Sequence, residues 1–176
     1  TAYGASAADG AWSLRDAYDM LELAQVFYLN TADLPRDPMD CLAALVSLTA
    51  SLPTHTVRSE DQIALQQFST PAPIAYLASL AARVSPGDTV LEPSAGTGLL
   101  AVFAARADAR LVLNEIDPAR ADKLQAAFPH APISRHDGEL IHDLLPLSVA
   151  PTAILINPPF SRSFGRHADP LAAFRH

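Results

Sequence analysis

A chain of 176 residues, 49% hydrophobic and 18% charged, is long enough for one globular core and hardly long enough for two. One cysteine, Cys41, excludes an internal disulfide, and no run reaches the roughly 20 apolar residues of a membrane span. Since no signal peptide pattern begins the sequence either, we expect a cytoplasmic protein without a membrane anchor. The net charge of −7 argues against a broad basic face, so a nucleic-acid substrate would require segments outside this chain.

Residues 1–60 are predicted to form an all-helical N-terminal annex. Within 14–28, apolar residues recur every three or four positions with charged residues between them, as in a surface helix with one buried stripe. That predicted stripe comprises Leu14, Ala17, Tyr18, Leu21, Ala24 and Tyr28. Asp37 followed by Pro38 predicts a second helix that ends before Pro53, and Ser59 begins a short third helix through Phe68.

Residues 61–176 alternate between helix and strand. The predicted helices span 70–84, capped by Thr70, and 98–107, 117–128 and 138–145; the predicted strands span 89–93, 109–116, 132–137 and 152–157. Strands separated by helices of this length pair in parallel, with helices on both faces of the sheet. The sequence therefore predicts an α/β, doubly wound domain behind the helical annex.

The turn after the first strand, at 91–101, is the first sign of a ligand site. Gly96 and Gly98 allow a tight turn and close backbone approach, and with Ala101 they fit a nucleotide-binding pattern. Glu115 ends the next strand, at the spacing of a ribose-binding acid. A turn without a ligand remains an alternative. No Gly-Lys-Ser/Thr follows, which disfavours a phosphate-binding P-loop.

Five segments together resemble the successive motifs of the N6-adenine DNA methyltransferases that use S-adenosylmethionine. In chain order they are 66–71, 91–98, 114–117, 136–138 and 157–160, with the sequence Asn-Pro-Pro-Phe in the last. The helical leader, 52–71 and 157–161 are also similar to the methyltransferase-like N-terminal region of bacterial strawberry-notch-like helicase proteins. The resemblance implies a Rossmann-like methyltransferase sheet, S-adenosylmethionine as cofactor and a C-terminal helicase-like region as partner.

The resemblance also implies a cofactor site. Glu92 would lie near the amino group of the methionine, Glu115 would accept both ribose hydroxyls, and Asp137 would accept from the adenine amino group. Phe68 could instead be a core aromatic and Asp137 a helix cap. The implied cofactor residues are Phe68, Ser69, Thr70, Glu92, Pro93, Ser94, Ala95, Gly96, Thr97, Gly98, Glu115, Ile116, Asp137 and Asn157.

The loop at 157–160 would carry the chemistry. An exocyclic amine is a poor nucleophile because its lone pair is delocalised into the ring, so methylation needs acceptors for its two hydrogens. The resemblance implies that the side-chain oxygen of Asn157 and the carbonyl of Pro158 are those acceptors. It also implies that Phe160 stacks on a base flipped from the DNA duplex. Pro158 and Pro159 would hold the acceptors in place by fixing the backbone.

Other functions remain open. A non-catalytic cofactor-binding or scaffolding module, a methyltransferase acting on RNA guanine or protein glutamine, and a nicotinamide-dependent enzyme all suit parts of the pattern. No metal is expected, since His136 and His142 are six residues apart and no cysteine partners exist. Because a complete sheet of this type has three more strands, we expect the methyltransferase domain at 61–176 to be C-terminally truncated, with the first four strands only.

Overall fold

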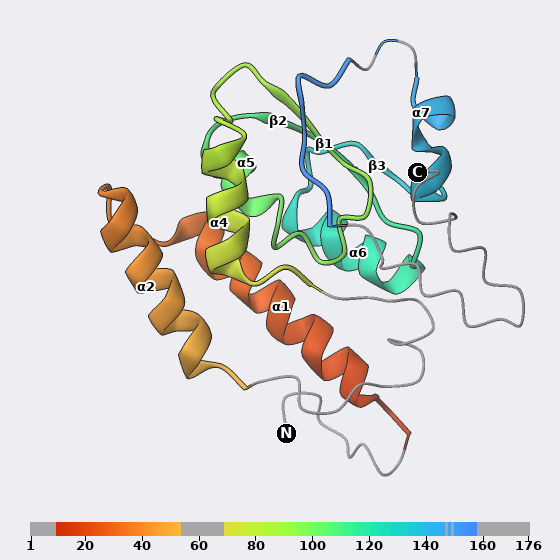
Figure 1. Ribbon diagram of the computed structural model, residues 1–176. Coiled ribbons are helices and arrows are strands. Elements are labelled where there is room, and N and C mark those ends of the chain that lie inside the picture. Colours follow the sequence, from red (N-terminus) through yellow and green to blue (C-terminus); the bar gives the residue numbers. More distant parts are fainter. Residues whose placement is uncertain (1–9, 54–68, 147, 149, 158–176) are drawn as a thin grey trace, which may run out of the picture.

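The computed structural model describes residues 10–53, 69–146, 148 and 150–157 (Figure 1). Phe68, Pro158, Pro159 and Phe160 therefore lie outside the described residues, as do the predicted third helix and the boundary between 60 and 61. No helix in the described ranges is long and apolar enough to cross a membrane.

Two N-terminal helices form where the sequence predicts them. Helix α1 (Leu14–Thr31) begins at Ser13, whose side chain accepts from the backbone N–H of Asp16 while the Asp16 side chain accepts from Ser13 in return. Helix α2 (Pro38–Ser51) begins at Asp37, whose carboxylate accepts from two backbone N–H groups of the first turn. Both predicted starts are confirmed, because each cap satisfies helix N–H groups that have no partner within the helix.

The buried face of α1 is not the predicted stripe. Its buried residues are Asp19, Glu22, Leu23, Val26 and Leu29. Leu14 and Tyr28, which the apolar pattern places inside, are 48% and 54% exposed. The predicted stripe is wrong because apolar periodicity treats carboxylates as exposed, whereas Asp19 and Glu22 are paired with the buried Arg120.

A parallel sheet lies at the centre of the chain, with the order β3-β2-β1-β4. Its strands are β1 (Thr89–Glu92), β2 (Arg110–Asn114), β3 (Ile133–Ser134) and β4 (Ala153–Ile154). The first strand, β1, is central; β2 and β3 follow on one side of it, and the chain then crosses back to place β4 on the other side. This order and the parallel pairing confirm the predicted α/β, doubly wound, Rossmann-like fold. The two edge strands are shorter than predicted.

The helices that precede and connect the strands differ from the predictions mainly at their ends. They are α4 (Ala72–Ala81), α5 (Val102–Arg106), α6 (Pro118–Ala127), the 3₁₀ helix η2 (Gly138–Leu140) and α7 (Ile141–Leu144). The predicted cap at Thr70 is wrong: Pro71 is the N-cap of α4, without a side-chain hydrogen bond, and the Thr70 hydroxyl accepts from Asn157 instead. The helix predicted from 98 begins at Val102, because Gly98 to Ala101 complete the turn.

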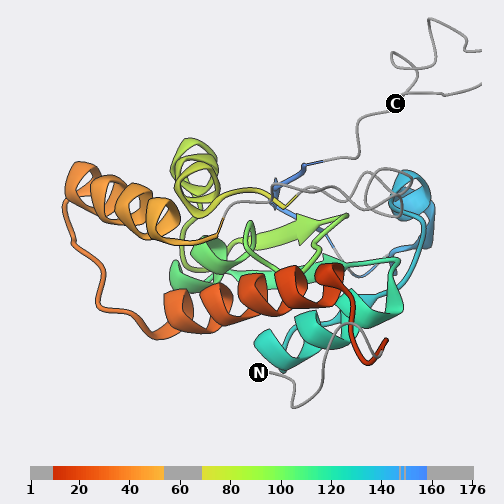
Figure 2. The same ribbon diagram turned by 90° about the horizontal axis from the view of Figure 1, so that it is seen from below.

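Helices cover the sheet unequally. The main core joins Val90, Leu111 and Leu113 of the sheet to buried residues of α1, α2, α4, α5 and α6. On the other face, Leu91 and Val112 pack against Ile141 of α7. Helix α1 lies beside α6, and α2 lies beside α4, whereas α7 lies away from α1 and α2 (Figures 1 and 2). Helix α1 therefore packs within the same core as the sheet.

Gly98 tests how the turn is packed against α6. Its φ is +97°, and a Cβ would lie 2.4 Å from Phe128 Cε2 and 3.0 Å from Leu124 Cδ1. We expect Gly98→Ala to lower the free energy of unfolding by about 2 to 5 kcal/mol, the sum of a left-handed backbone penalty and overpacking. Urea denaturation is the measurement. Gly87→Ala is the matched control, since Gly87 has a φ of +92° with nothing within 4 Å and should show the backbone penalty alone. Equal losses in the two variants would contradict the packing role.

Candidate active site

Asn114 joins the carboxyl ends of three strands. This side chain is 1% exposed, and its amide nitrogen donates to the carbonyls of Pro93 and His136, at 2.9 Å each. Its oxygen accepts from Ser134 Oγ at 2.7 Å and from the His136 N–H at 2.9 Å. All the hydrogen-bonding capacity of one buried amide is thus used to hold the strand ends at which ligands bind in folds of this class. Sequence analysis did not single out Asn114, although a polar residue ending an apolar strand is a usable signal.

The glycine turn is closed by Glu115. One carboxylate oxygen accepts from the Gly96 N–H and the other from the Asp117 N–H, both at 2.8 Å. The Gly98 N–H donates to the Ala95 carbonyl at 2.9 Å. Because both glycine N–H groups already donate within the protein, neither is presented to a phosphate. The arrangement is therefore a poor cradle for the pyrophosphate of a nicotinamide dinucleotide.

Glu92 ends β1 as a buried acid beside Glu115. It is 2% exposed, and burial together with the neighbouring Glu115 charge raises its pKa well above the ordinary value of 4.5. Its Oε2 atom has no hydrogen-bond partner among the described residues. A buried carboxyl oxygen without a partner is costly, and a cationic ligand group would remove that cost. The ammonium group of S-adenosylmethionine fits this requirement.

Thr70 and Asn157 bring the segment before α4 to the loop after β4. Asn157 Nδ2 donates to Thr70 Oγ1 at 3.0 Å, across 87 positions of sequence. A cavity of about 350 Å³ opens there, lined by Ser69, Thr70, Pro71, Ile74, Ala78, Leu100, Ile156 and Asn157. Three of the predicted site residues thus meet around one cavity at the carboxyl edge of the sheet.

The remaining predicted residues surround this edge in different environments. Ile116 is 58% exposed, which leaves an apolar surface next to Glu115. Asp137 is exposed and accepts from the Glu139 N–H at 3.0 Å, so its helix-capping alternative is realised. A Cβ on Gly138 would lie 3.0 Å from the Pro93 carbonyl, which places the segment of Asp137 directly against the turn. Ala95 and Thr97 are buried in the turn.

Charged residues that sequence analysis did not assign to the site lie behind the turn. Glu22 Oε2 accepts from Thr97 Oγ1 at 2.9 Å, and Arg120 Nη2 lies 3.1 Å from where a Gly96 Cβ would be. No sequence signal pairs Glu22 with Arg120, since 98 positions separate them.

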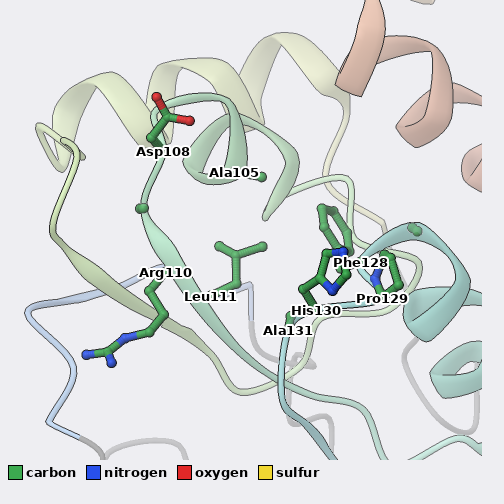
Figure 3. Close-up of a pocket in the computed structure, with 10 residues that line it drawn as sticks. Ala105, Asp108, Arg110, Leu111, Phe128, Pro129, His130 and Ala131 are labelled. Carbon is green, nitrogen blue, oxygen red and sulfur yellow. The ribbon is translucent and has the colours of Figure 1, made fainter.

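A second cavity, of about 410 Å³, lies at the amino-terminal ends of β2 and β3 (Figure 3). Its lining includes Arg110 and His130 and none of the predicted site residues. In this view Arg110 and His130 lie on opposite sides of Leu111, so their polar groups do not converge. The Arg110 guanidinium donates instead to Thr89 Oγ1, at 2.8 and 3.1 Å. We assign no site to this cavity.

Several solved structures named as methyltransferases are similar to this chain. TrmN from Thermus thermophilus is 23% identical, with a TM-score of 0.47, over 56% of this chain and 31% of TrmN. PH1948 from Pyrococcus horikoshii, a candidate RNA methyltransferase, is 22% identical, with a TM-score of 0.50, over 68% of this chain and 59% of PH1948. The RNA methyltransferase from Salinibacter ruber, in complex with S-adenosyl-L-homocysteine, is 22% identical, with a TM-score of 0.43, over 51% of this chain and 60% of that one.

These likenesses bear on the fold. The similarity to PH1948 supports the Rossmann-like α/β fold. The matched regions span 31% to 60% of the length of the three structures. No protein-family model matches the sequence, and no curated protein matches it significantly.

The buried Glu92 carboxyl makes stability depend on pH. Because its pKa is raised in the folded state, the folded protein binds more protons than the unfolded chain from about pH 4.5 up to the raised pKa. The free energy of unfolding should therefore fall as pH rises through this window. We expect Glu92→Gln to reduce that fall and to be more stable than the wild type at pH 8, as measured by urea denaturation at several pH values. The exposed Glu139→Gln is the control, and the same pH dependence in Glu92→Gln and wild type would contradict the assignment.

Proposed function

We propose that this chain forms the cofactor-binding part of an S-adenosylmethionine-dependent methyltransferase that methylates N6 of adenine in DNA. The observation that carries the proposal is the hydrogen bond from Asn157 to Thr70. It places the expected acceptor of the substrate amine beside the segment expected to contact the methionine end of the cofactor, where the methyl group is carried. A direct transfer requires this proximity.

The carboxylates at the strand ends suit the rest of the cofactor. Glu92 would pair with the ammonium group and Glu115 would accept the ribose hydroxyls, using lone pairs beyond those that hold the turn. Ile116 would cover the adenine ring and Asp137 would accept from its amino group. When bound, the cofactor would supply an electrophilic methyl group on a sulfonium. A dinucleotide is less well supported, because its phosphates would approach two acidic side chains and a turn whose glycine N–H groups already donate.

Asn157 would act on the substrate through the direction of its carboxamide. Donation from Nδ2 to Thr70 fixes the rotation of the group, and hence the direction in which its oxygen can accept. That oxygen would accept a hydrogen bond from one N–H of the substrate amine, and the Pro158 carbonyl would accept one from the other. Phe160 would stack on the flipped base. Both acceptors draw the nitrogen lone pair out of the ring system, so the amine becomes nucleophilic.

RNA is the second candidate substrate. PH1948, whose fold this chain shares, is a candidate RNA methyltransferase, and the Salinibacter ruber structure is named as an RNA methyltransferase. The net charge of −7 disfavours tight binding of either nucleic acid by this chain alone. We therefore propose that a helicase-like region of the same cytoplasmic protein holds the nucleic acid. The alternative is a non-catalytic scaffold, and an activity assay distinguishes it from a methyltransferase.

Asn157→Ala separates catalysis from binding. In the full-length protein, the variant should retain S-adenosylmethionine affinity and lose methyl transfer at least about a hundredfold, the effect of removing one preorganised polar group from an active site. Transfer of tritium from labelled cofactor to DNA and RNA, followed by digestion to nucleosides, measures both the rate and the product. Val46→Ala, on the exposed side of α2, is the control. Undiminished transfer by Asn157→Ala would refute its role, and cofactor binding without any transfer by the wild type would favour the scaffold.

Glu115→Ala tests the cofactor. We expect S-adenosylhomocysteine to bind with a free energy weaker by roughly 1.5 to 3 kcal/mol, the value of hydrogen bonds to a charged group. Isothermal calorimetry is the measurement, with the exposed Asp143→Ala as the matched acidic control. Since Glu115 also holds the turn, urea denaturation of the free variant shows whether the turn region has unfolded. Equal affinity of Glu115→Ala and wild type would reject Glu115 as the ribose acceptor.

A further inference from the structure

A buried carboxylate of α1 contacts both predicted cofactor segments. Glu22 is 4% exposed, and its Oε2 atom accepts from Ser69 Oγ at 2.6 Å and from Thr97 Oγ1 at 2.9 Å. Ser69 belongs to the segment before α4, and Thr97 lies between the two glycines of the turn. One side chain of the N-terminal annex therefore bridges two segments that were expected to contact the same ligand.

Arg120 of α6 supplies the counter-charge. It is 5% exposed, and its Nη2 atom lies 3.3 Å from Glu22 Oε2 and 3.0 Å from Ser69 Oγ. Its Nε atom lies 3.4 Å from Asp19 Oδ1. The guanidinium also lies against Gly96, since a Cβ there would be 3.1 Å from Nη2. The cluster is thus in contact with the turn itself.

The buried pair of Glu22 and Arg120 is not needed to hold α1 against the rest of the protein. Helix α1 already packs into the main core through Leu23, Val26 and Leu29, and buried ion pairs are often no more stabilising than apolar residues in their place. The pair fixes the positions of Ser69 and Thr97 relative to each other, because both hydroxyls donate to the same carboxylate oxygen of Glu22. A ligand that contacts the segments of both Ser69 and Thr97 then binds to residues that are already ordered, so binding loses less conformational entropy.

We propose that Glu22 is a positioning residue of the cofactor site, and that α1 is consequently an integral part of that site. Glu22 acts through Ser69 and Thr97, with Arg120 as its counter-ion. The inference rests on the proposed function, because the ligand that spans the two segments is S-adenosylmethionine or its demethylated product.

The test compares two carboxylates of one cluster in the full-length protein. Glu22→Gln removes the charge that joins Ser69, Thr97 and Arg120, whereas Asp19→Asn removes a carboxylate whose charge partners are Arg120, Lys123 and Arg15. Urea denaturation first establishes conditions under which both variants are folded. We expect calorimetry to show S-adenosylhomocysteine bound at least about tenfold more weakly by Glu22→Gln, the lower end for hydrogen bonds to a charged group, and within about twofold of wild type by Asp19→Asn.

A double-mutant cycle adds a measurement that a merely structural role would not change. If Glu22 acts through Thr97, then Thr97→Val and Glu22→Gln should not multiply in their effects on affinity. The double variant should bind S-adenosylhomocysteine within about twofold of the weaker single variant, because two variants in contact that remove the same interaction are not additive.

Each outcome decides the matter. Equal affinities of wild type and Glu22→Gln overturn the positioning role and leave the proposed function intact. An equal loss in Asp19→Asn and Glu22→Gln also overturns it, since a general loosening of α1 would then account for both. Multiplicative effects in the cycle contradict action through Thr97. A wild-type protein that does not bind S-adenosylhomocysteine rejects the proposed function, and this inference with it.

Discussion

The carboxyl edge of the sheet depends on the four hydrogen bonds of Asn114. Parallel strands end on the same side of a sheet, and side chains add to the backbone bonds that hold the loops after them, such as the bond from the Ala95 N–H to the Asn114 carbonyl. Asn114 does so by accepting from and donating to groups that follow or end β1 and β3, from within β2. Glu92, Glu115 and Asp137 each lie within two residues of a group in this set. One buried amide therefore helps to fix the distances between the candidate ligand-binding carboxylates.

Acidic side chains dominate this edge and its support, and they are of two kinds. Asp19 and Glu22 are paired with Arg120, although burial still raises the pKa of Asp19. Glu92 has no such partner among the described residues, and its raised pKa records the cost of ionising it. The two kinds of acid therefore differ in whether the protein supplies a counter-charge. The paired acids have a cation within the protein, whereas among the described residues Glu92 has none and would gain one from a cationic ligand.

The fold was accessible from sequence because its signals are local. Alternating helix and strand patterns, the cap at Asp37 and the glycine turn each depend on residues a few positions apart, and the parallel pairing of the strands follows from the alternation. The resemblance in motif order implied that Thr70 and Asn157 serve one site, but their hydrogen bond was not predicted. The cluster of Glu22 and Arg120 was not accessible, since a charged residue on a helix is read as exposed unless its partner is known.

The dispersal of the candidate site along the chain has a physical consequence. Glu22, Ser69, Thr97, Glu115 and Asn157 come from five separate segments, and each contributes only when α1, the turn and β4 have packed together. A ligand that contacts several of them can bind only the folded state, so its binding free energy adds to the free energy of unfolding. Because α1 supplies the residue that bridges Ser69 to Thr97, the annex is subject to the same coupling as the sheet. The helical annex and the sheet are then one unit with respect to the ligand, although their sequence patterns differ.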